Sequence, residues 1–589
     1  MTVEAISATS DAGPPHERLA VPLRRLARWR LLRLTPLLLV VGLLLVWPLI
    51  MLAAGSFRTA PPGFVADWST AAWRQAFDNP ATLQAIRNSV IIALVSTTVA
   101  TAFAAGLAFL SERSDAPLRR WITPAMVLAF ATPGLFYAIG FGLVANPYTG
   151  FLNTLVQVIT GTNWTPLDIE TWPGLLAVVT LKKTAVIYLF LIGPFRALDP
   201  SHDEASLMAG AGPLATFLRI DIPILAPALT GAVLLGVVSG LQTFDMALVL
   251  GWPFDLQVIA TRIFQFVNEG ATPQYDKASV LSLALLAVVA GLSLAQARIL
   301  GRRSFVTVGG KSRAGARMAL GRGRLVAAVL IALYLLVGVA LPVGSVLLSS
   351  FQPFPGVYSG FSFQSYVDVA LIPRLWDSLK LTLLLAFGTG LAAMALAFLV
   401  VQGGRWAGPR AAAWLKFATF IPLAMPGVVT ALAIGWAFLS LPGLKHLYGT
   451  AELVAVALVV CAMPFAVQAI QAGASQIAPE LHEAAAVAGA PPHRVLFDVA
   501  FRLLIPSFLI GWFMTAVLAT GNLEVPLLLK SPGEQPVSAV IYDLNARGEF
   551  SAACALLTVT LIVKALIALA GYAGFRAFRN LRPQPGAAR

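Results

Sequence analysis

Ionisable side chains inside long apolar runs are the first candidates for chemistry in this sequence. Lys182 and Lys183 are adjacent in one run, and Asp245 and Glu524 occupy matching places in two others. A charge at the centre of a membrane costs at least about 2.5–3.5 kcal/mol, and such charges commonly line substrate or ion pathways. Carboxylates are hard oxygen ligands for cations, and lysines attract anions. We therefore treat these four residues as a possible substrate pathway.

The lysines have three possible interpretations. If their span enters the membrane near Pro173, Lys182 lies about nine residues in, roughly 14 Å. Neighbouring residues on a helix diverge by about 100°, so at most one of the two lysines points straight into a central pathway. They could pair with a buried carboxylate, line the pathway, or lie outside a misplaced span.

The two carboxylates follow the cytoplasmic starts of their spans by about twenty residues, roughly 30 Å of helix. We therefore expect Asp245 and Glu524 near the outer mouth. They would either attract substrate or stand in water as interfacial residues.

The composition predicts that these residues are positioned by membrane helices. Of 589 residues, 58% are hydrophobic and 12% charged, which excludes an ordinary soluble enzyme. The formal charge of +14 comes mainly from basic segments beside apolar runs, the pattern of cytoplasmic loops rather than of a nucleic-acid-binding surface. Cys461 and Cys554 both fall within apolar runs, so we expect neither a disulfide framework nor a metal site.

The sequence predicts an all-α membrane protein with twelve spans, each of about 20 residues. The first run is too long for a signal peptide, so we expect a retained anchor. The predicted spans are 34–54, 88–111, 121–143, 173–193, 224–250, 279–299, 324–348, 378–401, 414–438, 451–471, 503–528 and 551–574.

The two halves of the chain resemble each other. At a constant offset of 279 residues Glu204 meets Glu483, Gly210 meets Gly489 and Asp245 meets Glu524. Pro133-Gly134 meets Pro426-Gly427 at an offset of 293. We therefore predict two parallel repeats of six spans, related by an axis along the membrane normal.

The basic segments divide the chain and predict its orientation. We expect a cytoplasmic tail at 1–33, repeats at 34–300 and 324–575, a basic cytoplasmic linker at 301–323 and a cytoplasmic tail at 576–589. Both termini would then be cytoplasmic. So would the repeated polar stretches 203–227 and 482–506.

Each repeated stretch predicts a short docking helix. Ser201 and Glu204 have the spacing of a capping box, so we expect a helix that starts at Ser201 with Glu204 in its first turn. Small residues follow, among them Ala205 and Gly210, and would let another backbone approach. The second copy keeps the pattern but has Glu480 at the cap position. The residues that recur between the copies are Glu204, Ala205, Gly210, Glu483, Ala484 and Gly489.

These two stretches, with their order E-A-[AS]-x-x-x-G, resemble the EAA loop of permeases in binding-protein-dependent ABC importers. The second copy departs from the first in having Arg502 in place of Pro223. The segments LQTFDMALVLGWP and GNLEVPLLLKSP are most similar to those of iron(III)-type permeases, a lineage that includes thiamine and 2-aminoethylphosphonate systems.

The resemblance implies a fused permease of the type I fold in a bacterial inner membrane. Two copies of a cytoplasmic ABC ATPase would dock on the EAA loops, and a periplasmic binding protein would deliver the solute. Iron(III) is the first expectation for the solute. 2-Aminoethylphosphonate, thiamine and a polyamine are the alternatives.

We expect this chain to bind no cofactor and to catalyse no reaction. Gly310-Lys311-Ser312 ends like a P-loop, but Phe305 stands where an earlier glycine is required. No His, Asp or Ser constellation recurs in the spans. An ion-coupled secondary transporter is the rival class, but it has no need of paired ATPase-docking loops.

The outer loop 146–172 predicts one further element. Five apolar residues fall on one helical face and would form a short interfacial helix. This helix would either lie over the bundle or contact substrate. The five residues are Phe151, Leu152, Leu155, Val156 and Ile159.

Overall fold

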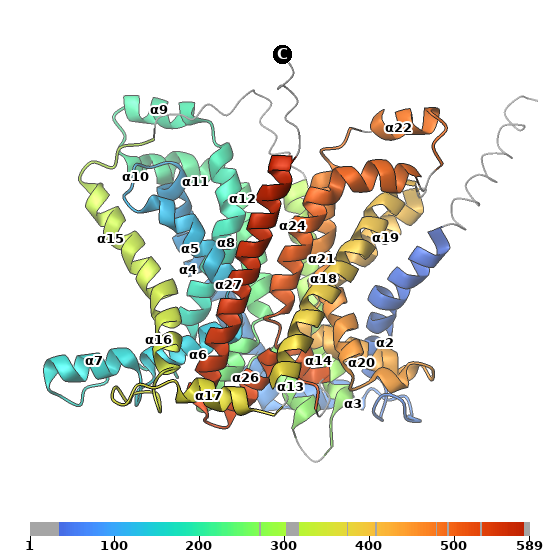
Figure 1. Cartoon of the computed structure of the whole chain (residues 1–589), viewed down its shortest axis with the longest axis horizontal. Helices are drawn as coiled ribbons and strands as arrows, with labels where there is room; N and C mark the ends of the chain where they lie inside the picture. The colour runs from blue at the N-terminus through green and yellow to red at the C-terminus, as the bar shows by residue number, and fades with distance from the viewer. Residues whose placement is uncertain are drawn as a thin grey trace, which may run out of the picture.

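The computed structural model describes residues 34–269, 272–301, 317–373, 375–406, 409–478, 480–491, 494–529 and 533–581. Helices dominate these ranges, which confirms the prediction of an all-α membrane protein (Figure 1). The tail 1–33, most of the linker with its Gly310-Lys311-Ser312, and the last eight residues lie outside the described residues.

The first half begins with a span at Leu34–Gly55, which contains η1 (Gly42–Val46) and α2 (Trp47–Gly55). The elements that follow are α3 (Ala71–Asp78), α4 (Pro80–Glu112), α5 (Arg119–Ala131), α6 (Gly134–Ala145), α7 (Phe151–Thr160), α8 (Trp172–Ala197), α9 (Pro200–Met208), α10 (Pro213–Thr216), η2 (Phe217–Asp221), α11 (Ile222–Ile224), α12 (Ala226–Leu241), η3 (Ala247–Gly251), η4 (Trp252–Phe254), α13 (Ile259–Asn268) and α14 (Tyr275–Gly301).

The second half has a similar order of elements. They are α15 (Gly323–Leu335), η5 (Leu336–Ala340), α16 (Leu341–Ser349), α17 (Gln364–Leu371), α18 (Leu375–Trp406), α19 (Pro409–Ala424), α20 (Gly427–Ser440), η6 (Lys445–Leu447), α21 (Ala451–Ala474), α22 (Glu480–Val487), η7 (Val495–Phe501), α24 (Arg502–Ala519), α25 (Glu524–Leu529), α26 (Val537–Ala546) and α27 (Phe550–Leu581).

Within the described ranges, nine helices are long and apolar enough to cross a membrane, and four bent pairs raise the possible number to thirteen. The predicted number of twelve lies between these limits. The prediction of one continuous helix is wrong for two spans, 121–143 and 414–438. Each of them consists of two helices. The chain bends by 105° between α5 and α6 and by 118° between α19 and α20.

The two bends have the same local cause. Pro133 and Pro426 each lack an amide hydrogen and restrict the residue before them, and a glycine follows each proline. The preceding helix therefore ends at an alanine, and a new helix starts at the glycine. A hydropathy pattern registers the apolar composition of such a pair and not the bend within it.

The predicted spans 224–250 and 503–528 are also interrupted. α12 ends at Leu241 and α24 at Ala519, and in both cases the chain turns before the next short helix. Asp245 and Glu524 follow these turns, in the interior of the bundle. Their expected place near an outer mouth was therefore wrong, because the helices end before they reach it.

The packing of the two halves follows one pattern. α4 packs on α8 and α12, just as α18 packs on α21 and α24. The first helix of each half packs on the other half, since α2 contacts α20 and α16 contacts α6. Small buried residues such as Ala93, Ala100 and Ala104 let the helices around α4 approach closely.

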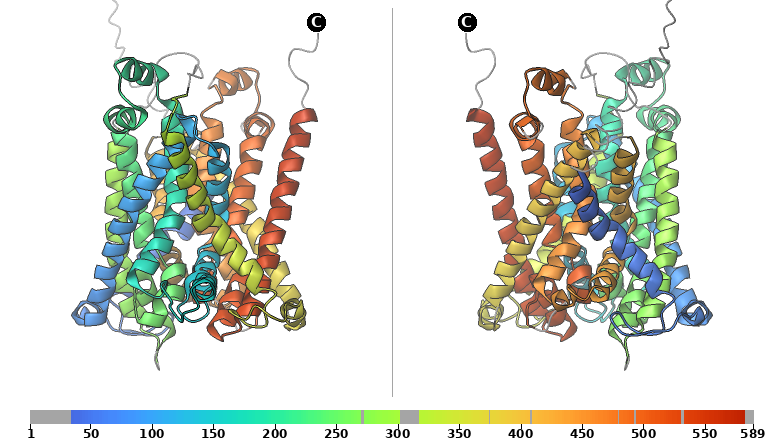
Figure 2. Two further views of the ribbon diagram at one scale, coloured as in Figure 1. Left: turned by 90° about the vertical axis from the view of Figure 1, so that its left-hand side faces the viewer. Right: turned by 90° about the vertical axis from the view of Figure 1, so that its right-hand side faces the viewer.

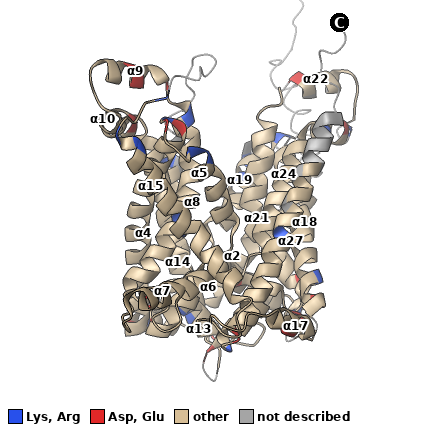
Figure 3. Cartoon of the chain, turned by 60° about the vertical axis from the view of Figure 1, so that its left-hand side comes forward, with Lys and Arg blue, Asp and Glu red and all other residues tan. Residues whose placement is uncertain are grey.

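The long helices run between two polar ends. Figures 1 and 2 show them side by side, with α9 and α22 at one end and α7, α13 and α17 at the other. Figure 3 shows that Lys, Arg, Asp and Glu gather at these ends, while the helices between them are largely uncharged. This distribution is typical of a bundle that spans a bilayer.

The short helix predicted in the outer loop is present as α7. Its Asn153 is buried and bonds the carbonyls of Asn146 and Leu167, whereas Val158 and Ile159 are exposed. Figure 1 shows α7 projecting sideways from the bundle, so most of the helix does not cover other spans.

Candidate functional site

The first candidate site is α9, which contains Glu204. Its start differs from the predicted capping box. Asp199 is the N-cap, its side chain accepts a hydrogen bond from the Ser201 amide at 2.9 Å, and Pro200 occupies the first helical position. Asp followed by Pro is a strong start signal, which explains why the helix begins before Ser201. The hydrogen bonds from Ser201 lower the pKa of Asp199 below its ordinary value.

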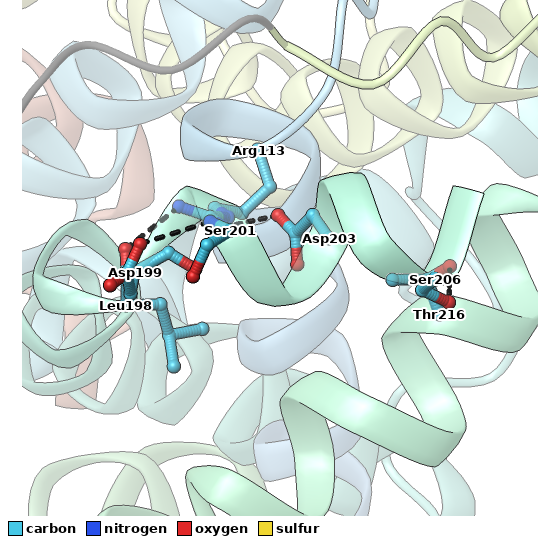
Figure 4. Close-up of polar contacts among 7 residues, drawn as sticks. All are labelled: Arg113, Leu198, Asp199, Ser201, Asp203, Ser206 and Thr216. Atoms are coloured by element: carbon cyan, nitrogen blue, oxygen red, sulfur yellow. Dashed lines mark hydrogen bonds and ion pairs between the residues drawn. The ribbon is translucent and has the colours of Figure 1, made fainter. Parts of the chain in front are cut away.

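Arg113, the residue after α4, ties α9 to the bundle (Figure 4). Its guanidinium donates to the Leu198 carbonyl at 3.1 Å and forms an ion pair with Asp203. Both charged side chains are less than a tenth exposed, and Asp221 of η2 is buried beside them. Because the ion pair is buried, the loss of either partner leaves an uncompensated charge.

The opposite side of α9 is free for contact. Glu204 and Ala205 are exposed, as is Met208. Ser206 points back to the bundle, where its hydroxyl lies 2.8 Å from that of Thr216 (Figure 4). The helix thus has a side held by the bundle and a side that carries two of the motif residues into solvent.

Gly210 and Gly489 close the two motif helices in the same way. Both have a positive φ, +83° and +76°, which residues with a Cβ adopt at a cost. The amide after each glycine bonds back to the helix, Ala211 to Ser206 and Ala490 to Ala485, each at 3.1 Å. This is a Schellman-type end, and it explains why glycine is needed at this place in the motif.

The second motif helix, α22, differs in how it is held. Glu483 lies on this helix and Ala484 is exposed, but the structure does not describe the Glu483 side chain. At the offset of 279 residues, Asp203 corresponds to His482 and Asp221 to Ala500. The second half therefore has no acidic residue at either position. Arg405 instead bonds the Ala474 carbonyl at 2.8 Å.

Exposed apolar residues also recur at the end of the bundle that carries α9 and α22. Met208 and its counterpart Val487 are 88% and 89% exposed, and Leu218 and its counterpart Phe497 are 55% and 56% exposed. Large apolar side chains that are exposed at equivalent places beside the motif helices are candidates for a contact surface. The surface is therefore present twice, once on each half.

The second candidate site is a cavity of about 380 Å³ between the halves. It is lined from the first half by the α5–α6 bend, Lys182, Gln242 and Asp245. From the second half it is lined by residues near the α19–α20 bend, Cys461, Asn522 and Glu524. The structure thus brings three of the four predicted pathway residues together.

Lys182 lines this cavity with its ammonium group held at the end of α5. The ammonium donates to the carbonyls of Ala129 at 2.6 Å, Phe130 at 3.2 Å and Thr132. It also lies 5.3 Å from the centre of the Tyr137 ring. A cation at this place compensates the negative end of the helix dipole.

Lys183 points elsewhere. Its ammonium donates to the hydroxyls of Ser96 at 2.6 Å and Thr97 at 3.0 Å, both on α4. Among the described residues no carboxylate lies within 4 Å of either lysine, so the buried ion pair, one of the three interpretations, is not formed there. Of the two lysines, Lys182 is the one that lines the cavity.

Asp245 and Glu524 cap the helices that follow the two bends. Glu524 accepts a hydrogen bond from the Val428 amide at 2.8 Å, at the start of α20. Asp245 accepts one from the Leu135 amide, at the start of α6. Carboxylates suit the positive ends of helices, so both residues stabilise the bends as well as lining the cavity. Among the described residues no cluster of three His, Cys, Asp or Glu forms a metal site.

Two residues important for these sites were not identified from the sequence. Arg113 has no local signal beyond its place directly after a long apolar helix, where a charged side chain can bond a neighbouring chain segment. Lys564 lies within α27, and its ammonium is buried with no hydrogen-bond partner. It is close to Gly521, which lines the cavity, and its place inside an apolar run was the signal that could have identified it.

Comparison with known proteins shows what this bundle is similar to. Residues 390–580 match the sequence model of the family described as binding-protein-dependent transport system inner membrane component. The ferric transport system permease protein FbpB of Actinobacillus pleuropneumoniae is 27% identical over 454 residues, 75% of this chain. The putative ferric transport system permease protein FbpB 1 of Haemophilus influenzae is 28% identical over 397 residues, 65% of this chain.

The matched region makes up 64% and 60% of these two relatives, so this chain spans less than two thirds of their length. The sulfate transport system permease protein CysT of Salmonella typhimurium is 27% identical over 295 residues, which is 48% of this chain and 98% of CysT. A relative of about half the length is expected if this chain is a fusion of two units. All three relatives are permeases, which are transport components and not enzymes.

The fold, the paired motif helices and these similarities agree with one another. This chain is similar to the inner membrane components of binding-protein-dependent transport systems, the permeases of ABC importers, and has their type I fold.

Proposed function

We propose that this chain is the permease subunit of an ABC importer that moves iron(III) from a periplasmic binding protein to the cytoplasm. Two copies of a separate ABC ATPase supply the energy, and the chain itself binds no cofactor and makes or breaks no covalent bond. The observation that carries the proposal is the pair of exposed helices, α9 and α22, at one end of a membrane bundle.

In this mechanism the motif helices transmit force. Each ATPase binds one motif helix through Glu204, Ala205 and Gly210 or through their counterparts Glu483, Ala484 and Gly489. When the ATPases close on ATP, the helices move with them and the two halves reorient around the central cavity. The buried Arg113–Asp203 pair supports this role for α9, because it joins the helix to the end of α4.

The proposed orientation places both termini and both motif helices in the cytoplasm of a bacterial inner membrane. It is supported by the predominance of basic residues in the connecting segments assigned to that side. Cysteines introduced in place of Met208 on α9 and of Thr165 after α7, both exposed, should react with membrane-impermeant reagents from opposite sides. Reaction of both from one side would contradict this orientation.

Iron(III) is proposed as the solute because two relatives are ferric permeases by name. The carboxylates of Asp245 and Glu524 would add negative potential and hard oxygen ligands to the cavity. The Lys182 charge does not argue strongly against a cation, because three carbonyls of α5 already hold the ammonium.

An anion such as 2-aminoethylphosphonate is the second candidate solute. The ammonium groups of Lys182 and Lys564 near the cavity favour it. Uptake of radiolabelled iron and of 2-aminoethylphosphonate by cells with the complete importer separates the candidates. For iron, uptake should tolerate Lys182→Met and Lys183→Met better than Asp245→Asn and Glu524→Gln. Phosphonate uptake that is lost with Lys182→Met, without any iron uptake, would overturn the first candidate.

A further inference from the structure

The two bends around the cavity match except for one side chain. Residues 131–135 read ATPGL and residues 424–428 read AMPGV, and a carboxylate caps the helix after each bend. Lys182 of α8 reaches the first bend. Its counterpart on α21 at the offset of 279 residues is Cys461, which lines the cavity and carries no cationic group.

The first bend shows what this helix end can bind. The Lys182 ammonium is in effect a cation bound by three backbone carbonyls at the negative end of α5. At the offset of 293 residues that relates the two bends, Ala129, Phe130 and Thr132 correspond to Pro422, Leu423 and Met425. All three counterparts line the cavity.

The carbonyls of the second bend retain acceptor capacity. Among the described residues the Pro422 carbonyl accepts only from the Met425 amide, at 3.2 Å, and the Met425 carbonyl lies 3.5 Å from the Thr430 hydroxyl. The Gly427 amide, four residues after Leu423, bonds Glu524 instead of closing a helical turn. No Lys or Arg side chain bonds these carbonyls in the part of the chain that the structure describes.

We propose that the end of α19 is a cation-binding subsite of the importer, formed by the carbonyls of Pro422, Leu423 and Met425 with the Glu524 carboxylate nearby. The proposal rests on the proposed transport function and specifies where the solute contacts the permease. In the first half the Lys182 ammonium occupies the equivalent place. A solute cation can therefore bind only at the second helix end, the end of α19 near Cys461.

Two kinds of solute present the required chemistry. A ferric ion is a hard cation that prefers oxygen ligands, and 2-aminoethylphosphonate carries a primary ammonium group like that of Lys182. The ferric ion, or the ammonium group of 2-aminoethylphosphonate, would be attracted by the negative end of α19 and by Glu524. The effect of substitutions on the uptake of each compound distinguishes them.

The test introduces a lysine at position 461, the position in the second half that corresponds to Lys182. Cys461→Lys would place an ammonium group on the three carbonyls of α19 and block the subsite. We expect uptake by the complete importer to fall at least about tenfold, while Cys461→Met, similar in length but uncharged, retains it. The exchange variant Lys182→Cys with Cys461→Lys opens the first bend and should recover uptake at least about threefold over Cys461→Lys alone.

Thermal unfolding of the purified chain provides a readout independent of transport. Because its ammonium would be bound by carbonyls, Cys461→Lys should melt within a few degrees of Cys461→Met. Ala457→Lys, which buries an ammonium among apolar side chains on the same helix, should melt much lower. If the wild type imported neither compound, the proposed solutes would fail, and this comparison would still decide whether the helix end accepts a cation.

Three results would overturn the subsite. One is uptake by Cys461→Lys equal to that of Cys461→Met. Another is a melting temperature of Cys461→Lys as low as that of Ala457→Lys. The third is an exchange variant that transports no better than Cys461→Lys.

Discussion

Single residues decide how firmly the two motif helices are held. Arg113 and Asp203 form a buried pair under α9, whereas the residue of the second half that corresponds to Asp203 in the sequence is His482. A buried charge that loses its partner costs far more than an exposed one. The first half therefore connects its motif helix to the bundle through charge, and the residues of this pair are not repeated in the second half.

Arg113→Gln should destabilise the protein by about 3–5 kcal/mol, since it leaves Asp203 buried without its cation. Arg196→Gln is the matched control, because Arg196 pairs with Glu112 at the same end of the bundle but its side chain is 59% exposed. That change should cost about 0–1 kcal/mol. Thermal unfolding of both purified variants checks the difference. Equal melting temperatures would show that the buried pair does not stabilise the protein more than the exposed one.

Gly210→Ala should loosen the end of α9 without a steric clash. The added Cβ meets no atom within 4 Å, so the cost comes from the positive φ, about 1–2 kcal/mol. Gly212→Ala also meets no atom, but Gly212 has φ of −78°, which alanine adopts freely. Hydrogen exchange in α9 should accelerate about tenfold for the first variant and little for the second. Equal exchange would refute the need for glycine.

At the scale of elements, the bends between α5 and α6 and between α19 and α20 organise the centre of the protein. Each ends one helix and starts another, and residues of both bends line a shared cavity. Asp245, Glu524 and Lys182 compensate these helix ends. Half-helices with exposed ends are tolerated at membrane depth only where they line a cavity or are buried in protein.

Gly427→Ala should disrupt the second bend, because the new Cβ would collide with the Glu524 carboxylate that caps α20. The loss of this cap costs about 0.5–2 kcal/mol. Gly435→Ala on the same helix is the control, since its Cβ would make an ordinary contact at 3.6 Å with Leu529. A lower melting temperature only for Gly427→Ala is expected, and the shorter side chain of Glu524→Asp should recover part of the loss. An unchanged melting temperature would show that the cap is not needed.

The sequence predicted the helical class and the motif helices better than it predicted the interior. Apolar composition identifies membrane helices, but Pro133 and Pro426 had to be weighed with the glycines after them to reveal the bends. The partner of Lys182 could not be found among charged residues, because its partners are backbone carbonyls. The role of Arg113 depends on a contact with Asp203, 90 residues away in the sequence, which no local pattern specifies.

At the scale of the whole molecule, two similar halves with different local chemistry line one central cavity. Each half contributes a motif helix at one end and a bent pair at the centre, and each sends its first helix across to the other half. The halves differ in the residue that reaches the bend, Lys182 in the first and Cys461 in the second. They also differ in the motif helix, where Asp203 of the first half corresponds to His482. We expect the motif helices to act together in transport, while the central cavity is used asymmetrically.

The most direct test of this account is ATP-driven uptake by the complete importer in proteoliposomes, comparing the wild type with the variant that combines Glu204→Ala and Glu483→Ala. Asp377→Ala, which removes a 70% exposed carboxylate from the first turn of α18, is the control. The account predicts that the control transports normally and that the double variant inserts and folds but loses at least about tenfold in uptake. Uptake by the double variant equal to that of the wild type would contradict it.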